Sequence, residues 1–207
     1  MTATAFVRPP WASPQTLYRH LVETPTEEPL TLEEAKIYAG LDWPAGDPRD
    51  ALMRGFISAA RAKVEFDTGL ALPQQTWDLY FEATASGLIR LPAQATPLQS
   101  IAEVVALGAP GGPVTLTAPD FLVTASGRAI ALTDWPATWA PYTVRVVAGW
   151  PTPAALLTEA PLLRHAVGLL TAHYATLGRD LASTEEALPV PFGYEEAIAP
   201  HRLVWVT

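Results

Sequence analysis

The residues of this chain that could perform chemistry are few and lie far apart. His165 and His173 fall eight residues apart on one predicted helix, so about 12 Å of helical rise separates them. That separation is too long for two ligands of a single metal ion. His20 and His201 lie near the two ends of the chain. The histidines therefore predict no metal site, and positions in the core or at its polar edge explain them better.

Acidic pairs and glycine-rich loops give no stronger signal. Adjacent residues of a helix point about 100° apart, so Glu185 with Glu186, and Glu195 with Glu196, are better explained as solvated surface than as catalytic pairs. No G-x-S-x-G elbow marks a nucleophile. The stretch GAPGGP at 108–113 lacks a following lysine and lies between predicted strands, which indicates a hairpin turn. We predict no catalytic residue, no metal and no cofactor.

Composition narrows the class of protein further. The chain has 207 residues, of which 49% are hydrophobic and 16% charged, which excludes a disordered chain. Its 21 prolines and 13 glycines are too many for a simple helical bundle. A net charge of −8 and a pI near 4.9 do not fit a protein that grips DNA phosphates. The chain has no cysteine, and no apolar run long enough to predict a membrane span.

Two segments carry helix signals. Thr31 with Glu34 forms a capping box that starts one short helix. Asp47 and Pro48 start a second helix, which Gly69 ends. Apolar residues recur at helical spacing over 48–68, and again over a long helix at 161–177. We predict that these two helices pack on each other.

The segment between them has the pattern of strands. TWDLYFEA at 76–83 alternates apolar and polar residues, as in a strand with one buried face. Six further short segments, bounded by Gly, Pro, Asp or Ser, resemble strands: LIRL, SIAEVVAL, PVTLT, DFLVT, RAIAL and YTVRVVAG. The predicted fold class is therefore α+β, with a helical core and a small inserted antiparallel β domain.

These signals divide the chain into five stretches. In the first, Leu17 to Val22 is predicted as one short strand or helical turn. The predicted divisions are an N-terminal arm at 1–30, a first part of the helical core at 31–73, a β domain at 74–150, a second part of the core at 151–189 and a C-terminal docking tail at 190–207.

Tryptophans outside the helices suggest interfaces, because tryptophan in loops and tails is commonly an interface anchor. We assign Trp11, Trp135, Trp139 and Trp150 to an interface with a neighbouring subunit or the tail side. The alternative for the last three is local packing onto their own sheet. Residues 203–206, Leu-Val-Trp-Val, are apolar and β-prone after a proline-broken stretch, so we predict that residues 190–207 leave the subunit body and pair with another chain. Pairing with the chain's own β domain is the alternative.

The order of these segments resembles the head–tail connector (adaptor) family of tailed phages and gene transfer agents. The resemblance covers about residues 24–202, through EEPLTLEEAKIYAGLDW, the helix with AAR, the strand beginning QTW, PLQSIAEVVAL, YTVRVVAGW, LLRHAVGLLTAHYATLGRD and PFGYEEAIAPHR. No single piece is diagnostic, but the succession is specific. This chain has a longer N-terminal arm than the family pattern, and it continues past His201 and Arg202 with LVWVT.

The resemblance implies a structural protein without enzymatic activity. It implies a twelve-fold ring between portal and tail in the particle neck, after assembly in the bacterial cytoplasm. It implies a portal protein and a tail-side stopper or terminator as partners, and DNA that passes without specific binding. The tail residues then become portal-binding: Phe192, Tyr194, Leu203, Val204, Trp205 and Val206. The channel-lining candidates are Asp180, Glu185 and Glu186.

A second hypothesis comes from another class of protein. A β module that binds a small ligand or carbohydrate could use Trp135, Trp139 and Trp150 as a stacking platform. Such a module should bury these tryptophans around a cleft, and a connector should not.

Overall fold

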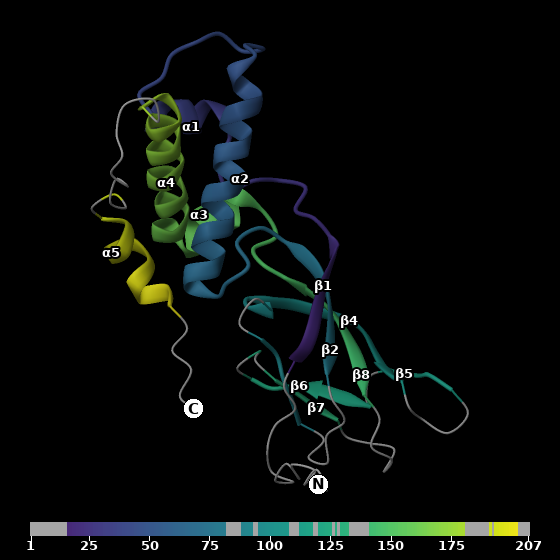
Figure 1. Ribbon diagram of the computed structural model, residues 1–207. Coiled ribbons are helices and arrows are strands. Elements are labelled where there is room, and N and C mark those ends of the chain that lie inside the picture. The colour runs from purple at the N-terminus through teal and green to yellow at the C-terminus, as the bar shows by residue number, and fades with distance from the viewer. Residues whose placement is uncertain are drawn as a thin grey trace, which may run out of the picture. The chain divides into compact units, whose positions relative to one another are not determined.

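The computed structural model describes residues 16–81, 88–92, 95–107, 112–117, 120–125, 127, 129–132, 141–180, 191 and 193–202. The chain forms two compact units (Figure 1). One comprises residues 1–24 and 75–148, and the other comprises residues 25–74 and 149–207. The first is built of strands and the second of helices, which confirms the α+β fold class.

The helical unit draws its elements from both halves of the sequence. Its helices are α1 (Leu32–Tyr38), α2 (Arg49–Thr68), α3 (Pro153–Glu159), α4 (Pro161–Asp180) and α5 (Tyr194–Ile198), followed by the 3₁₀ turn η2 (Ala199–His201).

The predicted helix ends are present. The Thr31 hydroxyl accepts from the Glu34 N–H at 3.2 Å, and a Glu34 carboxylate oxygen accepts from the Thr31 N–H at 2.9 Å. The Asp47 carboxylate accepts from the Arg49 N–H at 2.9 Å, and Pro48 already has helical backbone angles. Gly69 ends α2 with a φ of 72°. At each of these helix ends, backbone N–H or C=O groups that lack a partner within the helix are hydrogen-bonded, as the sequence signal predicts.

Helix α3 was missed by the sequence analysis, although its start carries a comparable signal. The Thr152 hydroxyl accepts from the Ala155 N–H at 3.1 Å, and Pro153 occupies the first turn. The helix is only seven residues long and buries a single leucine, Leu156, so it offers no periodic apolar pattern.

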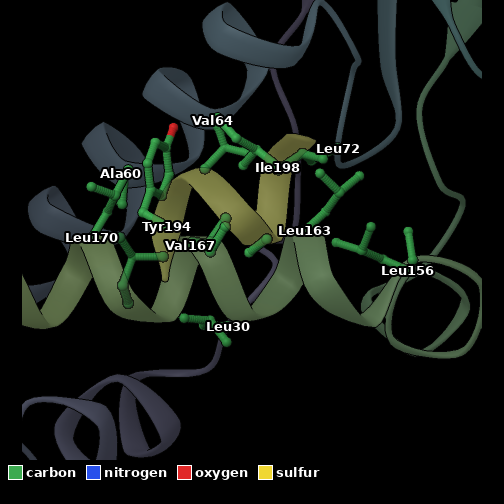
Figure 2. Close-up of a cluster of buried hydrophobic side chains, with 14 of the residues drawn as sticks. Leu30, Ala60, Val64, Leu72, Leu156, Leu163, Val167, Leu170, Tyr194 and Ile198 are labelled. Carbon is green, nitrogen blue, oxygen red and sulfur yellow. The ribbon is translucent and has the colours of Figure 1, made fainter. Parts of the chain in front are cut away.

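The core of the helical unit lies where α2 and α4 pack together, as predicted (Figure 2). Met53, Ile57, Ala60 and Val64 of α2 belong to the same buried cluster as four residues of α4. Phe56, which the sequence analysis placed in this stripe, is only half-buried at its edge. The α4 residues are Leu163, Ala166, Val167 and Leu170.

The β unit holds all seven predicted strands, and an eighth at its N-terminal edge. The strands are β1 (Thr16–Glu23), β2 (Gln75–Phe81), β3 (Leu88–Arg90), β4 (Leu98–Ala106), β5 (Val114–Leu116), β6 (Phe121–Val123), β7 (Ala129–Leu132) and β8 (Tyr142–Ala148).

The described strands of this unit form two antiparallel sheets. One has the order β1-β2-β8-β4-β5 and the other the order β3-β7-β6. The predicted strand or helical turn at Leu17 to Val22 is therefore a strand, paired with β2. Hairpins were predicted around 108–113 and 125–127, and the flanking strands β4 and β5, and β6 and β7, pair antiparallel. Residues 108–111 and 126 of the predicted turns lie outside the described residues.

Alternation along the strands separates a core face from a polar face. Buried residues of both sheets, such as Leu79, Val144 and Ile130, share one cluster. On the opposite face of the larger sheet, Arg145 donates to both carboxylate oxygens of Asp78 at 2.7 and 2.8 Å. No helix in the described part of the chain is long and apolar enough to cross a membrane.

The helical unit contains one backbone crossing that only glycine can occupy. The Trp150 N–H donates to the Leu72 carbonyl at 2.9 Å, which holds the two chain segments together. Between them, Gly149 has a φ of 101°, and a Cβ there would lie 2.1 Å from the Pro73 carbonyl oxygen. The atoms that a Cβ would meet belong to the backbone, which cannot rotate away as the end of a flexible side chain can. The overlap could therefore be relieved only by moving the chain segment itself.

We predict that Gly149→Ala costs at least ~4 kcal/mol of unfolding free energy, because steric overlap adds to the strain of a positive φ. Gly40→Ala is the matched control, since Gly40 also has a positive φ of 61° but has no atom within 4 Å of the added Cβ. It should cost only about 1–2 kcal/mol. Chemical denaturation of both variants checks this, and equal costs would contradict it.

Candidate interaction surfaces

The described residues contain no cluster of acidic and histidine side chains that could hold a metal ion. His165 instead contacts α1, with its Nδ1 3.1 Å from the Tyr38 hydroxyl and the two ring centroids 5.7 Å apart. The Tyr38 ring fits there because α4 carries Gly168, where an added Cβ would lie 2.5 Å from the ring. The geometry gives His165 a role in packing.

A buried polar cluster fixes the loop between α1 and α2. Asp50 accepts from the Trp43 indole N–H at 2.7 Å and from the Gly46 N–H at 2.8 Å, and Lys36 Nζ lies 3.0 Å from it. The hydrogen bond from Trp43 and that from Lys36 hold the pKa of Asp50 below its usual range. Arg49 lies over the Trp43 ring, 4.4 Å from its centroid.

This cluster shapes an apolar pocket at the N-terminal end of α2. The pocket has a volume of about 120 Å³. It is lined by Leu41, Trp43, Arg49, Leu52, Met53, Phe56 and Ala175. Neither the pocket nor the Asp50 cluster could be predicted from the sequence, because the spacing of Lys36, Trp43 and Asp50 does not show which of these side chains meet.

The C-terminal helix α5 corrects one sequence prediction. Residues 190–207 were expected to leave the subunit body, but Tyr194, Ala197 and Ile198 are buried in the core of the helical unit. Figure 2 shows Tyr194 in this core with α2 and α4. The prediction is wrong for residues 193–202, because α5 supplies apolar side chains that cover α4.

A hydrogen bond holds this helix in place. Tyr194 is 0% exposed, and its hydroxyl donates to Asp67 of α2 at 2.7 Å. Lys63 also contacts Asp67, at 2.5 Å. Tyr194 therefore cannot offer its side chain to a portal while α5 keeps this position. The other predicted portal-binding residues lie outside the described part of the chain: Phe192, Leu203, Val204, Trp205 and Val206.

Trp150 is also a core residue and not an exposed anchor. It is 8% exposed in the helical unit, and its indole N–H donates to Glu159 at 3.0 Å. This burial corrects its assignment to an interface, and it removes one member of the hypothetical stacking platform. Trp11, Trp135 and Trp139 lie outside the described residues.

The predicted channel residues lie at the end of the long helix α4 and after it in the sequence. Asp180 is the last residue of α4, and Glu185 and Glu186 lie outside the described residues.

Arg164 is a further structural residue that sequence analysis did not single out. Its guanidinium donates to the Pro29 carbonyl at 2.9 Å and to Glu34 at 2.6 Å. The hydrogen bond from Arg164 is the main cause that lowers the pKa of Glu34. The arginine thus joins α4 to the start of α1.

Comparison with known proteins gives matches only among solved structures. No protein-family model matches the sequence, and no curated protein matches it. A chain of the neck of an empty GTA (gene transfer agent) particle with C6 symmetry has a TM-score of 0.70 and 23% identity. A chain of the native GTA virion has 0.70 and 21%, and one of the native GTA neck with C12 symmetry has 0.64 and 22%.

Each match covers 92% of this chain and 98% of the other chain. At these identities the likeness shows the fold. The chain thus has the fold of a chain found in the neck of gene transfer agent particles, and the resemblance stated from the sequence is confirmed at this level.

We predict that Tyr194→Phe lowers the unfolding free energy by about 1.5–3 kcal/mol at pH 7, because a hydrogen bond to a charged carboxylate is lost. Burial, and then the bond to Asp67, raises the pKa of Tyr194 in the folded state. The folded state then holds a proton that the unfolded state releases above about pH 10, so this stabilisation is full below that pH and falls above it.

Denaturation of the wild type and Tyr194→Phe between pH 7 and pH 11 checks the prediction. The difference in stability between them should shrink above about pH 10. Tyr18→Phe is the control, since Tyr18 is 59% exposed and its substitution should change stability little at either pH. A difference that stays constant with pH would contradict the assignment.

Proposed function

We propose that this chain is a structural subunit of a head–tail connector, which forms a ring in the neck of a gene transfer agent or phage-like particle. The observation that carries the proposal is the fold match, which extends over nearly the full length of both chains and whose source is the particle neck. The order of sequence motifs noted above supports the same class independently. In this role the chain has no enzymatic activity.

Ring formation fits the symmetry of the similar assemblies. Two of the similar necks have C6 and C12 symmetry, and heterologous contacts between identical subunits close into rings. We propose twelve copies, with the portal on one side and a stopper or terminator protein on the tail side. The subunits assemble in the bacterial cytoplasm and then remain in the particle neck.

The ring's channel should let DNA slide. Each subunit carries a net charge of −8, and attractive contacts with phosphates would slow a moving duplex. We assign the lining to acidic or neutral groups, with Asp180, Glu185 and Glu186 as candidates.

We predict that the assembled ring does not bind duplex DNA tightly at physiological salt. The charge-reversed variant Glu185→Lys/Glu186→Lys should bind more tightly, and its affinity should fall steeply with salt. Fluorescence anisotropy with labelled duplex checks both. Tight binding by the wild-type ring would contradict the acidic lining, and an unchanged variant would exclude these two glutamates from it.

Portal attachment is proposed for the end of the chain. Arg202, the last described residue, has an extended backbone and is tied to Glu195 at 2.5 Å. The apolar residues 203–206 therefore start from a fixed point on the helical unit. Added as a strand to a portal sheet, they would satisfy their backbone and bury Trp205.

We predict that deletion of residues 203–207 abolishes portal binding and leaves the melting temperature unchanged, because the anchored segment 193–202 is retained. Co-purification with the portal and thermal unfolding measure the two effects. Trp205→Ala should weaken portal binding, whereas the control Trp11→Ala should not. A large loss of stability with attachment retained would show instead that the tail pairs with its own subunit.

A further inference from the structure

Helix α2 carries a second apolar stripe, on the side away from the core. We call it the outer seam, and it recurs at positions i, i+3, i+7, i+10 and i+14, the spacing by which one helix contacts another. At about 100° per residue, the seam lies about 200° around the helix from the core stripe. The outer seam consists of Leu52, Gly55, Ala59, Ala62 and Phe66.

All five residues of the outer seam are exposed. Leu52 is 59% exposed and Phe66 is 80% exposed. A large exposed phenylalanine in line with a leucine on one helix is an apolar surface that a partner would cover. The described part of the chain leaves this surface open.

The centre of the outer seam permits close approach. Gly55, Ala59 and Ala62 project little from the backbone, and a Cβ added at Gly55 would meet no atom within 4 Å. Helices with small residues at their contact can approach to interaxial distances near 8 Å. The partner therefore fits best as another helix, lying along a seam about 21 Å long.

The order of sizes in the outer seam identifies the partner helix. From either end it runs large, small, small, small, large, with Ala59 at the middle. An antiparallel second copy of α2 therefore places Phe66 of each copy beside Leu52 of the other, and small residues opposite small residues. The seam is complementary to itself about a two-fold axis, which is the condition for an isologous contact.

The apolar pocket lies at the end of the seam where Phe66 of the second copy would arrive. Leu52 belongs to both the seam and the pocket. The pocket's volume of about 120 Å³ is on the order of the ~150 Å³ cavity that accepts benzene in another protein. Side chains of a helix lean toward its N-terminus, which directs the incoming ring from Leu52 toward Phe56 and the pocket.

Charge at the edge of the seam supports the same orientation. Arg54 and Glu65 lie on one side of it, eleven residues apart. Antiparallel pairing centred on Ala59 places Arg54 of each copy near Glu65 of the other, and Glu65 also accepts from Arg61 of its own helix at 2.9 Å.

We propose that the free subunit associates with a second copy of itself through the outer seam, antiparallel and with the two-fold axis beside Ala59. The contact involves far fewer than the roughly 20–30 residues per side of a standard interface, so the dimer is weak and reversible. No such two-fold axis relates neighbouring subunits of a cyclic ring, so the contact is a property of the free chain, and formation of the proposed ring would require it to open. The inference does not depend on the proposed function.

The absence of cysteine from the chain makes a direct test possible. A residue beside a two-fold axis meets its own copy, with Cα atoms within the ~4.4–6.8 Å that a disulfide needs. Full-length Ala59→Cys should therefore form a disulfide-linked dimer under mild oxidation, at least ~10-fold faster than Arg54→Cys, the control on the same helix. Non-reducing gels measure both rates.

A second variant excludes chance collision. Ala62→Glu places a charge in the centre of the seam and should weaken self-association at least ~10-fold in sedimentation, with an unchanged melting temperature. Equal oxidation rates for the two cysteine variants, or a wild-type monomer at roughly 1 mM, would overturn the proposal. So would a contact that links Ala59 to a different surface of the second copy, because that geometry belongs to a ring.

Discussion

The packing of α2 against α4 is the interaction on which the helical unit depends. Its two apolar stripes come from segments about a hundred residues apart, and the helices α1, α3 and α5 each contact α4. Arg164 ties α4 to the start of α1, and the Tyr194 hydroxyl ties α5 to Asp67 of α2. These polar contacts set direction and position, whereas the burial of leucine, isoleucine and valine side chains supplies most of the stabilisation. A change that separates the two stripes therefore releases the C-terminal segment as well.

The same division of roles explains what α2 can do. One side of the helix is fixed in the core, so its outer side is presented as a rigid surface with defined spacing. At its N-terminal end, the hydrogen bonds among Lys36, Trp43 and Asp50 fix the α1–α2 loop in position next to the pocket. At its C-terminal end, the Asp67 carboxylate pairs with Lys63 and accepts the hydrogen bond from the Tyr194 hydroxyl. The helix thus presents its core stripe on one side and, on the other, the exposed outer seam through which we propose self-association.

Local signals in the sequence were sufficient for most of the fold. The capping box at Thr31, the start at Asp47 and Pro48, and the alternation in β2 each depend on residues within one turn or strand, and each was predicted. Tyr194 and Trp150 were wrongly assigned to interfaces. Their burial depends on segments far away in the sequence, which local patterns do not reveal: Asp67 lies 127 residues from Tyr194. The Asp50 cluster was missed for a related reason, since a loop whose course is unknown decides which side chains meet. The resemblance to connectors came from the order of the segments, not from any site residue.

The first and last strands of the inserted segment have a consequence for how the chain folds. Gln75 and Ala148 are paired partners at the ends of β2 and β8, so a formed sheet holds the two ends of a 74-residue excursion side by side. Without it, bringing α2 and α4 together would require closing a long flexible loop. With it, the connections that remain between α2 and α4 are residues 69–74 and 149–160, about 18 residues in place of about 92. The entropic cost of loop closure then falls by roughly 1.4 kcal/mol, at about 0.6 kcal/mol for each halving of length. The formed sheet thus shortens the loop that must close between α2 and α4, and its formation favours the helical core before any contact between the helices exists.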